Sequence, residues 1–294
     1  MRRAAVFVIV VLSACGRDPE PVAPVAPVAP VAPAPADIPR SDGRLIAGES
    51  DMRVLEPFTG DLDTIIDRGV VRVLVAPSGT HFDVDGHLQR GRTVDAADAF
   101  ERFVNHRIAP RTISVKLIST SETSLVSDVI AGEGDIAANV LRTFERDERV
   151  AFARPMRAGV REIIVSGPGT TALVSLEDVG GRTIHVRRNS DHHASLVRLN
   201  EQLKKIARPE ATIMFAPAEQ TDEALLDLVN AGRIPATLVD DYIYDAARSR
   251  LEKTAVNREV AVSQDGEIAW VTRKDSPRLL ALVNEFFTTH RLSF

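Results

Sequence analysis

Two hydrophobic patterns take turns along most of this chain. Short, largely apolar runs of three to six residues are typical of buried strands, and between them apolar residues recur at helical spacing, as at Phe100, Phe103 and Val104. Strands that alternate with helices are typical of a mostly parallel sheet covered by helices, so we predict an α/β fold. The predicted strands are Val70–Val75, Ile113–Ile118, Ile136–Val140, Ile163–Val165, Thr183–Val186, Ala236–Val239 and Ile268–Val271.

One unit of this pattern occurs twice. A helical segment ends at Gly132 before the strand Ile136–Val140, and another ends at Gly232 before the strand Ala236–Val239. Both glycines suit the left-handed residue that closes a helix. The repeat predicts two α/β lobes with a crevice between them, and ligands of parallel sheets bind at the carboxyl ends of strands. Polar residues collect at those ends, namely Arg142, Thr143 and Arg146 after the first strand and Asp240 and Asp241 after the second.

The N-terminus has the pattern of an export signal. Arg2 and Arg3 precede the apolar run Ala4–Leu12, which is too short to span a bilayer, and small residues lead to Cys15. This arrangement resembles a bacterial lipobox, which implies that Cys15 is lipidated and becomes the mature N-terminus. An ordinary signal peptide with a chance cysteine is the alternative. Because Cys15 is the only cysteine, no disulfide is expected.

Residues 16–59 are predicted to form a tether and lead-in. Pro21–Pro35 repeats Pro-Val-Ala, which favours extended polyproline II chain over helix or central strand. The remaining residues have the composition of a folded domain. A net charge of -5 with interspersed acids and bases argues against nucleic-acid binding, which needs a clustered basic face.

Several short motifs resemble a known family. One set is Gly134–Asn139, Glu145-Arg146, Phe152, Pro155 and Gly181–Ser190, and a second is Gly60–Leu62, Arg72–Val75, Ser175–Asp178 and Gly266–Trp270. The first set resembles the family 3 extracytoplasmic solute-binding proteins. The second resembles, still more closely, the N-terminal substrate-binding-like module of membrane-bound lytic transglycosylase F.

The resemblance implies a two-lobed type II periplasmic-binding-protein fold, or Venus flytrap. Residues 60–160 and 260–294 would form the first lobe and residues 161–259 the second, after a signal segment at residues 1–15. The hinges would be Glu162–Ser166 and Arg258–Val262, and closure around a ligand would be a hinge motion.

The resemblance also implies a site for a small zwitterion. Arg146 matches the arginine that grips an amino-acid carboxylate, for which a planar guanidinium is well suited. Asp240 matches the aspartate that pairs with the α-ammonium group. The further implied ligand contacts are Thr143, Ser190, His81 and Phe82.

Structural roles are the alternatives for three of these residues. Asp240 is placed to cap a helix beside Asp241, and Ser190 to begin the helix that contains Leu196. Arg146 belongs to the charged run Arg142–Arg149, which is also the pattern of a solvated surface.

Catalytic and metal-binding patterns are weak. Glu49-Ser50 resembles the Glu-Ser pair of lytic transglycosylases but lies in the tether region. His185, His192 and His193 suggest metal, yet an adjacent histidine pair rarely converges on one ion and no nearby carboxylate completes a known spacing. We therefore expect no enzymatic activity, no cofactor and no metal.

Two functional hypotheses follow. In the first, the protein is lipid-anchored at the periplasmic face of the envelope and binds an amino acid or short peptide, either for an ABC permease or as a sensor. Gly16 after Cys15 favours the outer membrane by resemblance to enteric lipoproteins. In the second, it is a non-catalytic regulatory module related to lytic transglycosylase F that responds to cell-wall peptides or a partner, with the chain truncated before a C-terminal domain.

Overall fold

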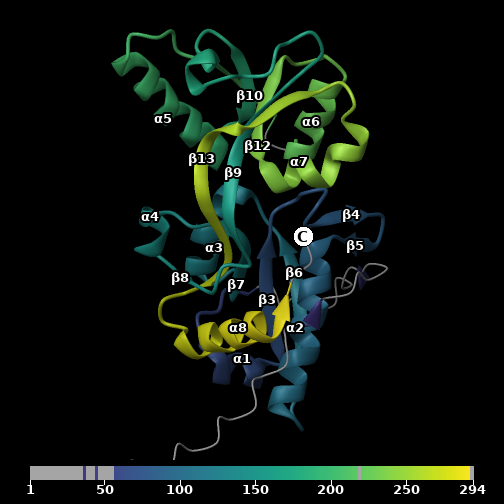
Figure 1. The fold of residues 1–294 in the computed structure, drawn as a ribbon. Coiled ribbons are helices and arrows are strands. Elements are labelled where there is room, and N and C mark those ends of the chain that lie inside the picture. Colours follow the sequence, from purple (N-terminus) through teal and green to yellow (C-terminus); the bar gives the residue numbers. More distant parts are fainter. Residues whose placement is uncertain (1–35, 38–43, 46–55, 218–219, 292–294) are drawn as a thin grey trace, which may run out of the picture. The chain divides into compact units, whose positions relative to one another are not determined.

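A nine-stranded sheet organises the part of the chain that the computed structural model describes, namely residues 36–37, 44–45, 56–217 and 220–291 (Figure 1). The strands lie in the order β11-β10-β12-β9-β13-β7-β3-β6, and β8 pairs with β13. They are β3 (Val70–Val75), β6 (Ser114–Ser119), β7 (Ile136–Leu141), β8 (Ala151–Phe152), β9 (Arg157–Ser166), β10 (Thr183–Arg187), β11 (Thr212–Ala216), β12 (Ala236–Asp240) and β13 (Ala255–Thr272). The predicted signal segment, Cys15 and the proline-rich run Pro21–Pro35 lie outside the described residues.

The two halves of the sheet repeat one topology. β3 pairs in parallel with β6 and β7, and β10 pairs in parallel with β11 and β12. In each half the first strand therefore lies between the second and the third, which confirms the predicted α/β class and the internal repeat. The sequence prediction missed β11, although Ile213–Ala216 is an apolar run of the expected length, and in the structure this edge strand is largely exposed.

β9 and β13 connect the two halves. They pair with each other in antiparallel fashion, and each also pairs antiparallel with the third strand of one half, β9 with β12 and β13 with β7. In Figure 1 they run side by side between the two groups of helices. We call β3, β6 and β7 with α1–α4 and α8 the first lobe, and β10–β12 with α5–α7 the second lobe.

Capping residues and glycines mark the ends of several helices. The Asp61 carboxylate accepts a hydrogen bond from Leu62 N at the start of α1, at 2.7 Å. Gly132 and Gly232 have φ angles of 80° and 68°, so both adopt the left-handed conformation that the sequence predicted. The helices are α1 (Leu62–Arg68), α2 (Arg92–Ile108), α3 (Leu125–Ala131), α4 (Phe144–Asp147), α5 (Asp191–Lys205), α6 (Asp222–Asn230), α7 (Asp241–Ala247) and α8 (Pro277–Thr289), with short 3₁₀ turns η2 (Glu122–Ser124), η3 (Leu176–Val179) and η4 (Arg248–Arg250).

Two small sheets complete the described secondary structure. β5 (Leu88–Arg90) pairs with both β2 (Arg44–Leu45) and β4 (Asp83–Asp85). β1 (Ala36–Asp37) pairs in parallel with β14 (His290–Arg291).

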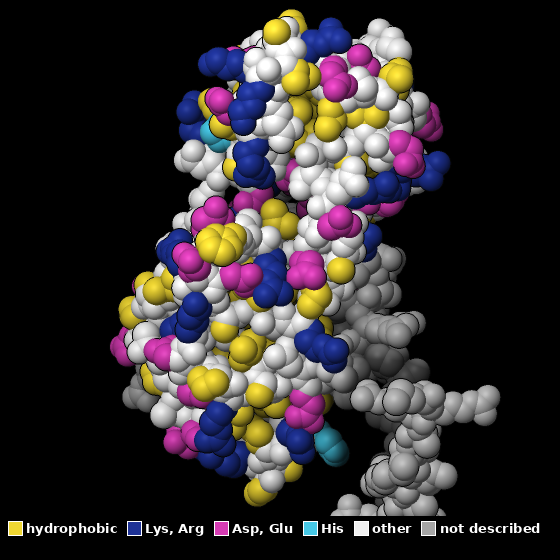
Figure 2. Space-filling model, turned by 60° about the vertical axis from the view of Figure 1, so that its left-hand side comes forward, with side chains coloured by type: hydrophobic (Ala, Val, Ile, Leu, Met, Phe, Trp, Pro, Cys, Tyr) yellow, Lys and Arg dark blue, Asp and Glu magenta, His cyan; other side chains and the backbone are white. Residues whose placement is uncertain are grey.

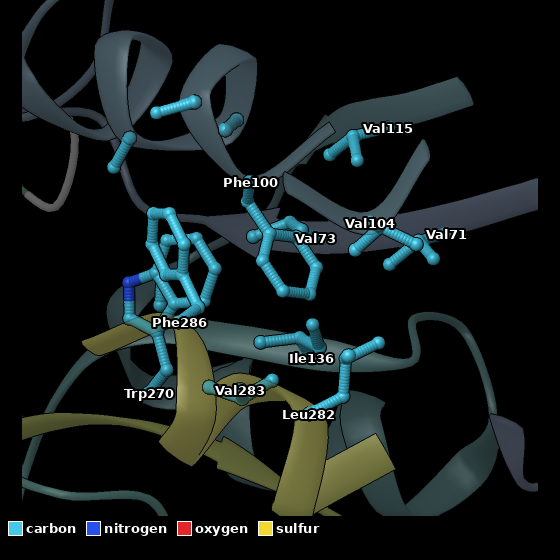
Figure 3. Close-up of a cluster of buried hydrophobic side chains, with 14 of the residues drawn as sticks. Val71, Val73, Phe100, Val104, Val115, Ile136, Trp270, Leu282, Val283 and Phe286 are labelled. Atoms are coloured by element: carbon cyan, nitrogen blue, oxygen red, sulfur yellow. The ribbon is translucent and has the colours of Figure 1, made fainter. Parts of the chain in front are cut away.

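An aromatic cluster forms the centre of the first lobe (Figure 3). Phe100 of α2 meets Trp270 of β13 and Phe286 of α8 edge to face, with ring centroids 5.8 and 5.2 Å apart. All three side chains are fully buried, and burying an aromatic ring of this size stabilises the fold by about 2 kcal/mol or more. Helix α8 thus packs against α2 in the core of the first lobe, far from α2 in the sequence.

The second lobe has its own core. Leu196, Leu199 and Leu203 form the apolar face of α5 and pack against Ile184 of β10 and Leu238 of β12. Each lobe therefore has its own hydrophobic core, which supports the polar groups at the ends of its strands.

Candidate functional site: a charged cleft between two lobes

A cavity of about 90 Å³ lies at the carboxyl ends of parallel strands from both lobes. Its walls include Ala76 directly after β3 and Leu141 at the end of β7. From the second lobe they include Arg187 at the end of β10 and Asp240 at the end of β12. This is the sheet edge at which ligands of α/β proteins bind.

The walls of the cavity carry more acidic than basic groups. Six carboxylates line it, against two guanidinium groups and two imidazoles. On the outer face shown in Figure 2, by contrast, acidic and basic side chains are interspersed. The acids are Glu122, Glu162, Asp191, Asp222, Glu223 and Asp240, and the nitrogen bases are Arg146, Arg187, His81 and His192.

Arg146 reaches the cavity from α4 and is paired across the cleft. Thr143 caps this helix by accepting a hydrogen bond from Arg146 N. The Arg146 guanidinium donates two parallel hydrogen bonds to the Asp191 carboxylate, at 3.0 and 2.9 Å, and a third to Leu141 O. Asp191 begins α5 of the second lobe, so this two-pronged ion pair joins the lobes. The two side chains are only 22% and 24% exposed. Arg146 is therefore not a fully solvated surface charge, which was the alternative for the run Arg142–Arg149.

A second ion pair joins the lobes through Arg187. Its Nη2 lies 2.6 Å from Glu122 of the first lobe and 3.1 Å from Asp222 of the second. Burial raises the pKa of Glu122, although the Arg187 charge works in the opposite direction. The guanidinium is therefore the principal group that favours the charged form of this carboxyl.

Two further contacts hold the lobes together. Glu223 of α6 accepts hydrogen bonds from Ser78 Oγ and Thr80 N, at 3.0 and 2.9 Å. Burial alone would raise the pKa of Glu223, but these hydrogen bonds outweigh it and lower the pKa. His81 Nε2 lies 3.2 Å from the Tyr242 hydroxyl of α7.

The backbone fixes His81 in a tight loop. Ser78 and Phe82 pair their backbones in both directions, and Thr93 N donates to His81 O at 3.0 Å. Gly91 permits this approach, because its φ is 119° and a Cβ there would lie 2.4 Å from His81 O. Burial lowers the pKa of His81 to about 4, so the imidazole is neutral at physiological pH.

Glu162, His192 and Asp240 form a cluster on the second-lobe side of the cavity. Their donor atoms all lie within 4.8 Å of one another. Burial alone would lower the pKa of His192, but the charges of Asp222, Asp240 and Glu162 and a hydrogen bond to Asp240 raise it to about 10. Burial raises the pKa of Glu162, although His192 works against it.

Not all of the predicted contacts reach the cavity. Arg146, Asp240 and His81 line it, whereas Thr143, Ser190 and Phe82 do not. The Ser190 hydroxyl accepts from His193 N at 3.2 Å and caps α5, as the structural alternative predicted, and Thr143 caps α4.

Phe82 corrects a prediction. Its ring is 2% exposed and belongs to the first-lobe core, because the residue after His81 points to the opposite side of the loop. Asp240 occupies the position before α7, but its side chain makes no capping hydrogen bond there. It is directed to the cleft instead.

Several residues of the site were not predicted from the sequence. Asp191 follows Ser190, the residue that caps α5. An acidic residue is common at the start of a helix, so the sequence gave no indication that Asp191 belongs to the site. Glu162 did leave a signal, because it is a lone acid at the start of the apolar run Ile163–Val165. Arg187, Glu122, Asp222, Glu223 and Tyr242 were not singled out either.

The two-lobed sheet and the polar cleft define a binding protein of the type II periplasmic class. The chain belongs to the bacterial extracellular solute-binding proteins, family 3, whose family model matches residues 72–293. Among the described residues, no helix has the length and apolar character needed to cross a membrane.

Curated relatives share the module but are longer. The chain is 30% identical over 224 residues to membrane-bound lytic murein transglycosylase F of Maricaulis maris, covering 74% of this chain and 44% of that protein. It is 24% identical over 241 residues to the protein of that name from Alcanivorax borkumensis, covering 81% of this chain and 48% of the relative. The chain thus spans about half the length of these relatives.

Solved structures agree on the fold. The arginine-bound form of truncated ArgBP from T. maritima superimposes with a TM-score of 0.60 at 18% identity, covering 77% of this chain and 98% of that one. A structure from work on glutathione import through GshT and TcyBC of Streptococcus mutans gives a TM-score of 0.62 at 16% identity, covering 74% of this chain and 87% of the other.

Proposed function

We propose that this solute-binding protein recognises a small zwitterion, either an amino acid or a short peptide. One observation carries the proposal: Arg146 of the first lobe and Asp240 of the second line the same cavity. A ligand with a carboxylate for one and an ammonium group for the other would bridge the lobes, and it would thereby favour the closed form of a hinged protein.

The Arg146–Asp191 pair supports the carboxylate part of this proposal. Arg146 already holds a carboxylate with the parallel two-bond geometry that a ligand carboxylate would use. Asp191 occupies the place of such a carboxylate in the structure. A bound ligand would displace Asp191, so that one charge-assisted pair is exchanged for another.

The acidic character of the cleft supports the ammonium part. Asp240 pairs with His192 at 3.4 Å, and Glu162 lies beside it. A cationic group that enters here would meet two carboxylates in a largely buried setting, where the attraction is stronger than at the surface.

A thermal-shift screen of the protein against amino acids, short peptides and muropeptides tests this proposal. A ligand at a hundredfold excess over its Kd adds about 2.7 kcal/mol of stability, which raises the melting temperature by about 5 to 10 °C for a protein of this size. Arg146→Ala should abolish the shift for any carboxylate ligand. Asp240→Asn should weaken ligands that carry an amine more than those without one.

Neighbouring residues provide matched controls. Arg142 is exposed, pairs with Asp147 and Glu267, and does not line the cavity, so Arg142→Ala should leave the shift unchanged. Asp241→Asn is the corresponding control for Asp240, because Asp241 contacts Arg161 instead. A ligand whose shift survives Arg146→Ala would place the binding site elsewhere.

We further propose that the protein is anchored through Cys15 and acts at the periplasmic face of the envelope, with the outer membrane favoured. The family comprises bacterial extracellular solute-binding proteins, which supports a location outside the cytoplasm. An ABC permease is the expected partner if the role is transport. Adjacent permease and ATPase genes would support this role.

The hinges are proposed to lie where β9 and β13 cross between the lobes. Their ladder is irregular, with register shifts between Val256 and Ala261 and again between Ser263 and Gly266. Irregular pairing leaves fewer ladder hydrogen bonds to resist bending. This supports lobe boundaries near residues 160 and 260, as the sequence suggested.

A regulatory role in cell-wall turnover is the second candidate. The observation that favours it is the match to membrane-bound lytic murein transglycosylase F in several bacteria, over about half of each relative. In this role the cleft would bind a wall-derived peptide and the chain itself would not cut peptidoglycan. Muropeptides in the thermal-shift screen test the ligand. Release of anhydro-muropeptides from peptidoglycan by the purified protein would contradict the absence of enzymatic activity.

A further inference from the structure

The cluster of Glu162, His192 and Asp240 brings donors from three separate elements to one point. Glu162 of β9 and Asp240 of β12 are direct partners across an antiparallel pair of strands, so their side chains lie on the same face of the sheet. His192 is the second residue of α5 and reaches this face from the adjoining helix. The three donor atoms lie within 4.8 Å of one another.

Glu162 lacks the partners that a buried carboxylate requires. It is 4% exposed, it lines the cavity, and neither of its carboxylate oxygens has a hydrogen-bond partner among the residues that the structure describes. A buried charge is costly unless it is paired or coordinates a metal, and like charges directly opposite each other on a sheet destabilise it. The opposed carboxylates of Glu162 and Asp240 therefore require a cation beside them, a position that the protonated His192, or a metal ion that replaces its proton, can fill.

The donor set suits a transition metal. Imidazole nitrogen with carboxylate oxygen is a common set for Zn²⁺ and related ions. His192 Nε2 and Asp240 Oδ1 are 3.4 Å apart. Two donors bound to one tetrahedral Zn²⁺ with bonds of about 2.1 Å would be separated by about 3.4 Å, so this pair needs little movement.

The Asp222 carboxylate lies near the other ring nitrogen of His192. His192 Nδ1 lies 3.8 Å from Asp222 Oδ1, on the side of the ring opposite Nε2. Histidines that bind metals commonly direct their other ring nitrogen to a carboxylate, which sets the tautomer and the orientation of the ring. The cavity beside the cluster leaves space for water or solute as the remaining ligand.

We propose that Glu162, His192 and Asp240 form a binding site for a divalent transition-metal ion. The sequence argued against metal because no carboxylate lies at a suitable spacing from the histidines. Strand pairing supplies two carboxylates from positions far along the chain. The adjacent His193 does not take part, since its ring packs against Phe215 with centroids 4.9 Å apart.

Calorimetric titration of the metal-stripped full chain with Zn²⁺ tests the site. Every protein in the test carries Cys15→Ser, because a thiolate is itself a zinc ligand. We expect one ion per chain. His192→Ala and Glu162→Gln should each weaken the affinity by about tenfold or more. His193→Ala, a change of the same residue type one position along the same helix, should leave the affinity unchanged.

The metal site and the proposed zwitterion site share Asp240, and the outcomes for their other residues distinguish the two proposals. Arg146→Ala should leave the affinity for Zn²⁺ unchanged while it abolishes carboxylate binding, so either proposal can fail without the other. Absence of saturable Zn²⁺ binding would overturn the metal site, and so would binding that persists at full strength in Glu162→Gln. Glu162→Gln keeps the size of the side chain and removes only an unpartnered charge, and its melting temperature without metal will show that it folds.

Discussion

Asp135 allows a direct test of how the motif Gly134–Asn139 contributes to the fold. Its carboxylate is fully buried beside the equally buried Arg72. It accepts hydrogen bonds from Arg72 N at 2.8 Å and Arg72 Nη2 at 3.1 Å, and a further one from Arg68. The substitution Asp135→Asn keeps the shape of the side chain and removes its charge, so that the guanidinium groups lose their counter-ion.

The expected loss of stability depends on the hydrogen bonds that Arg72 keeps after the substitution. Removal of one partner from a buried ion pair costs about 3 to 5 kcal/mol of unfolding free energy, because a buried charge is left uncompensated. Arg72 would still donate to the carbonyl oxygens of Glu56 and Gly132, at 2.8 and 2.7 Å. These contacts place the expected loss near the lower end, at about 3 kcal/mol. At about 2 to 4 °C per kcal/mol, the melting temperature should fall by about 6 to 12 °C.

Urea unfolding followed by circular dichroism measures this loss, and an exposed ion pair supplies the control. Asp67 pairs with Arg111 at the surface, where both side chains are more than half exposed. Asp67→Asn should therefore cost less than about 1 kcal/mol. Equal losses for Asp135→Asn and Asp67→Asn would refute the reasoning, because burial would then have no effect on how much an ion pair stabilises the protein.

Three further predictions concern the cleft and the anchor. His81 is neutral in the folded protein down to about pH 4 but titrates near 6.5 when unfolded, so unfolding takes up a proton between these values and stability falls as the pH drops through this window. Between pH 7 and pH 4.5 the wild-type protein should lose about 2.5 kcal/mol more unfolding free energy than His81→Gln, which lacks this titrating group, as measured by urea unfolding. Asp191→Asn should strengthen binding of a carboxylate ligand identified in the screen by about tenfold, because Arg146 is freed from its internal partner; weaker binding by calorimetry would contradict this. Cys15→Ser should release the protein from membranes, and a soluble, lipid-free wild-type protein by fractionation and mass spectrometry would rule out the anchor.

Much of the fold was predictable because its signals are local. The run Val70–Val75 is buried along almost its whole length, as a central parallel strand requires, and its bounds matched the prediction. Gly132 and Gly232 marked helix ends, since a left-handed residue is needed there and glycine adopts it at no steric cost. The repeat of helix, glycine and strand then indicated two lobes of like topology.

The site was predictable only in part. Arg146, Asp240 and His81 line the cavity, and their positions at strand ends or in the loop after a strand follow from the parallel topology. Ser190 and Thr143 serve as helix caps, because a hydroxyl at the first position of a helix satisfies backbone groups within its own turn. Sequence position alone does not separate a cap from a ligand contact.

Tertiary structure decided which charges meet. Asp191 is 45 residues from Arg146 along the chain, and the two face each other only because their lobes close on one cleft. Glu162 and Asp240 become neighbours through the register of β9 on β12, which depends on the packing of the whole second lobe. Periodicity, turn chemistry and helix caps are short-range and can be read from the chain, whereas the charge balance of the cleft depends on contacts between distant segments, and these form only when the sheet is assembled.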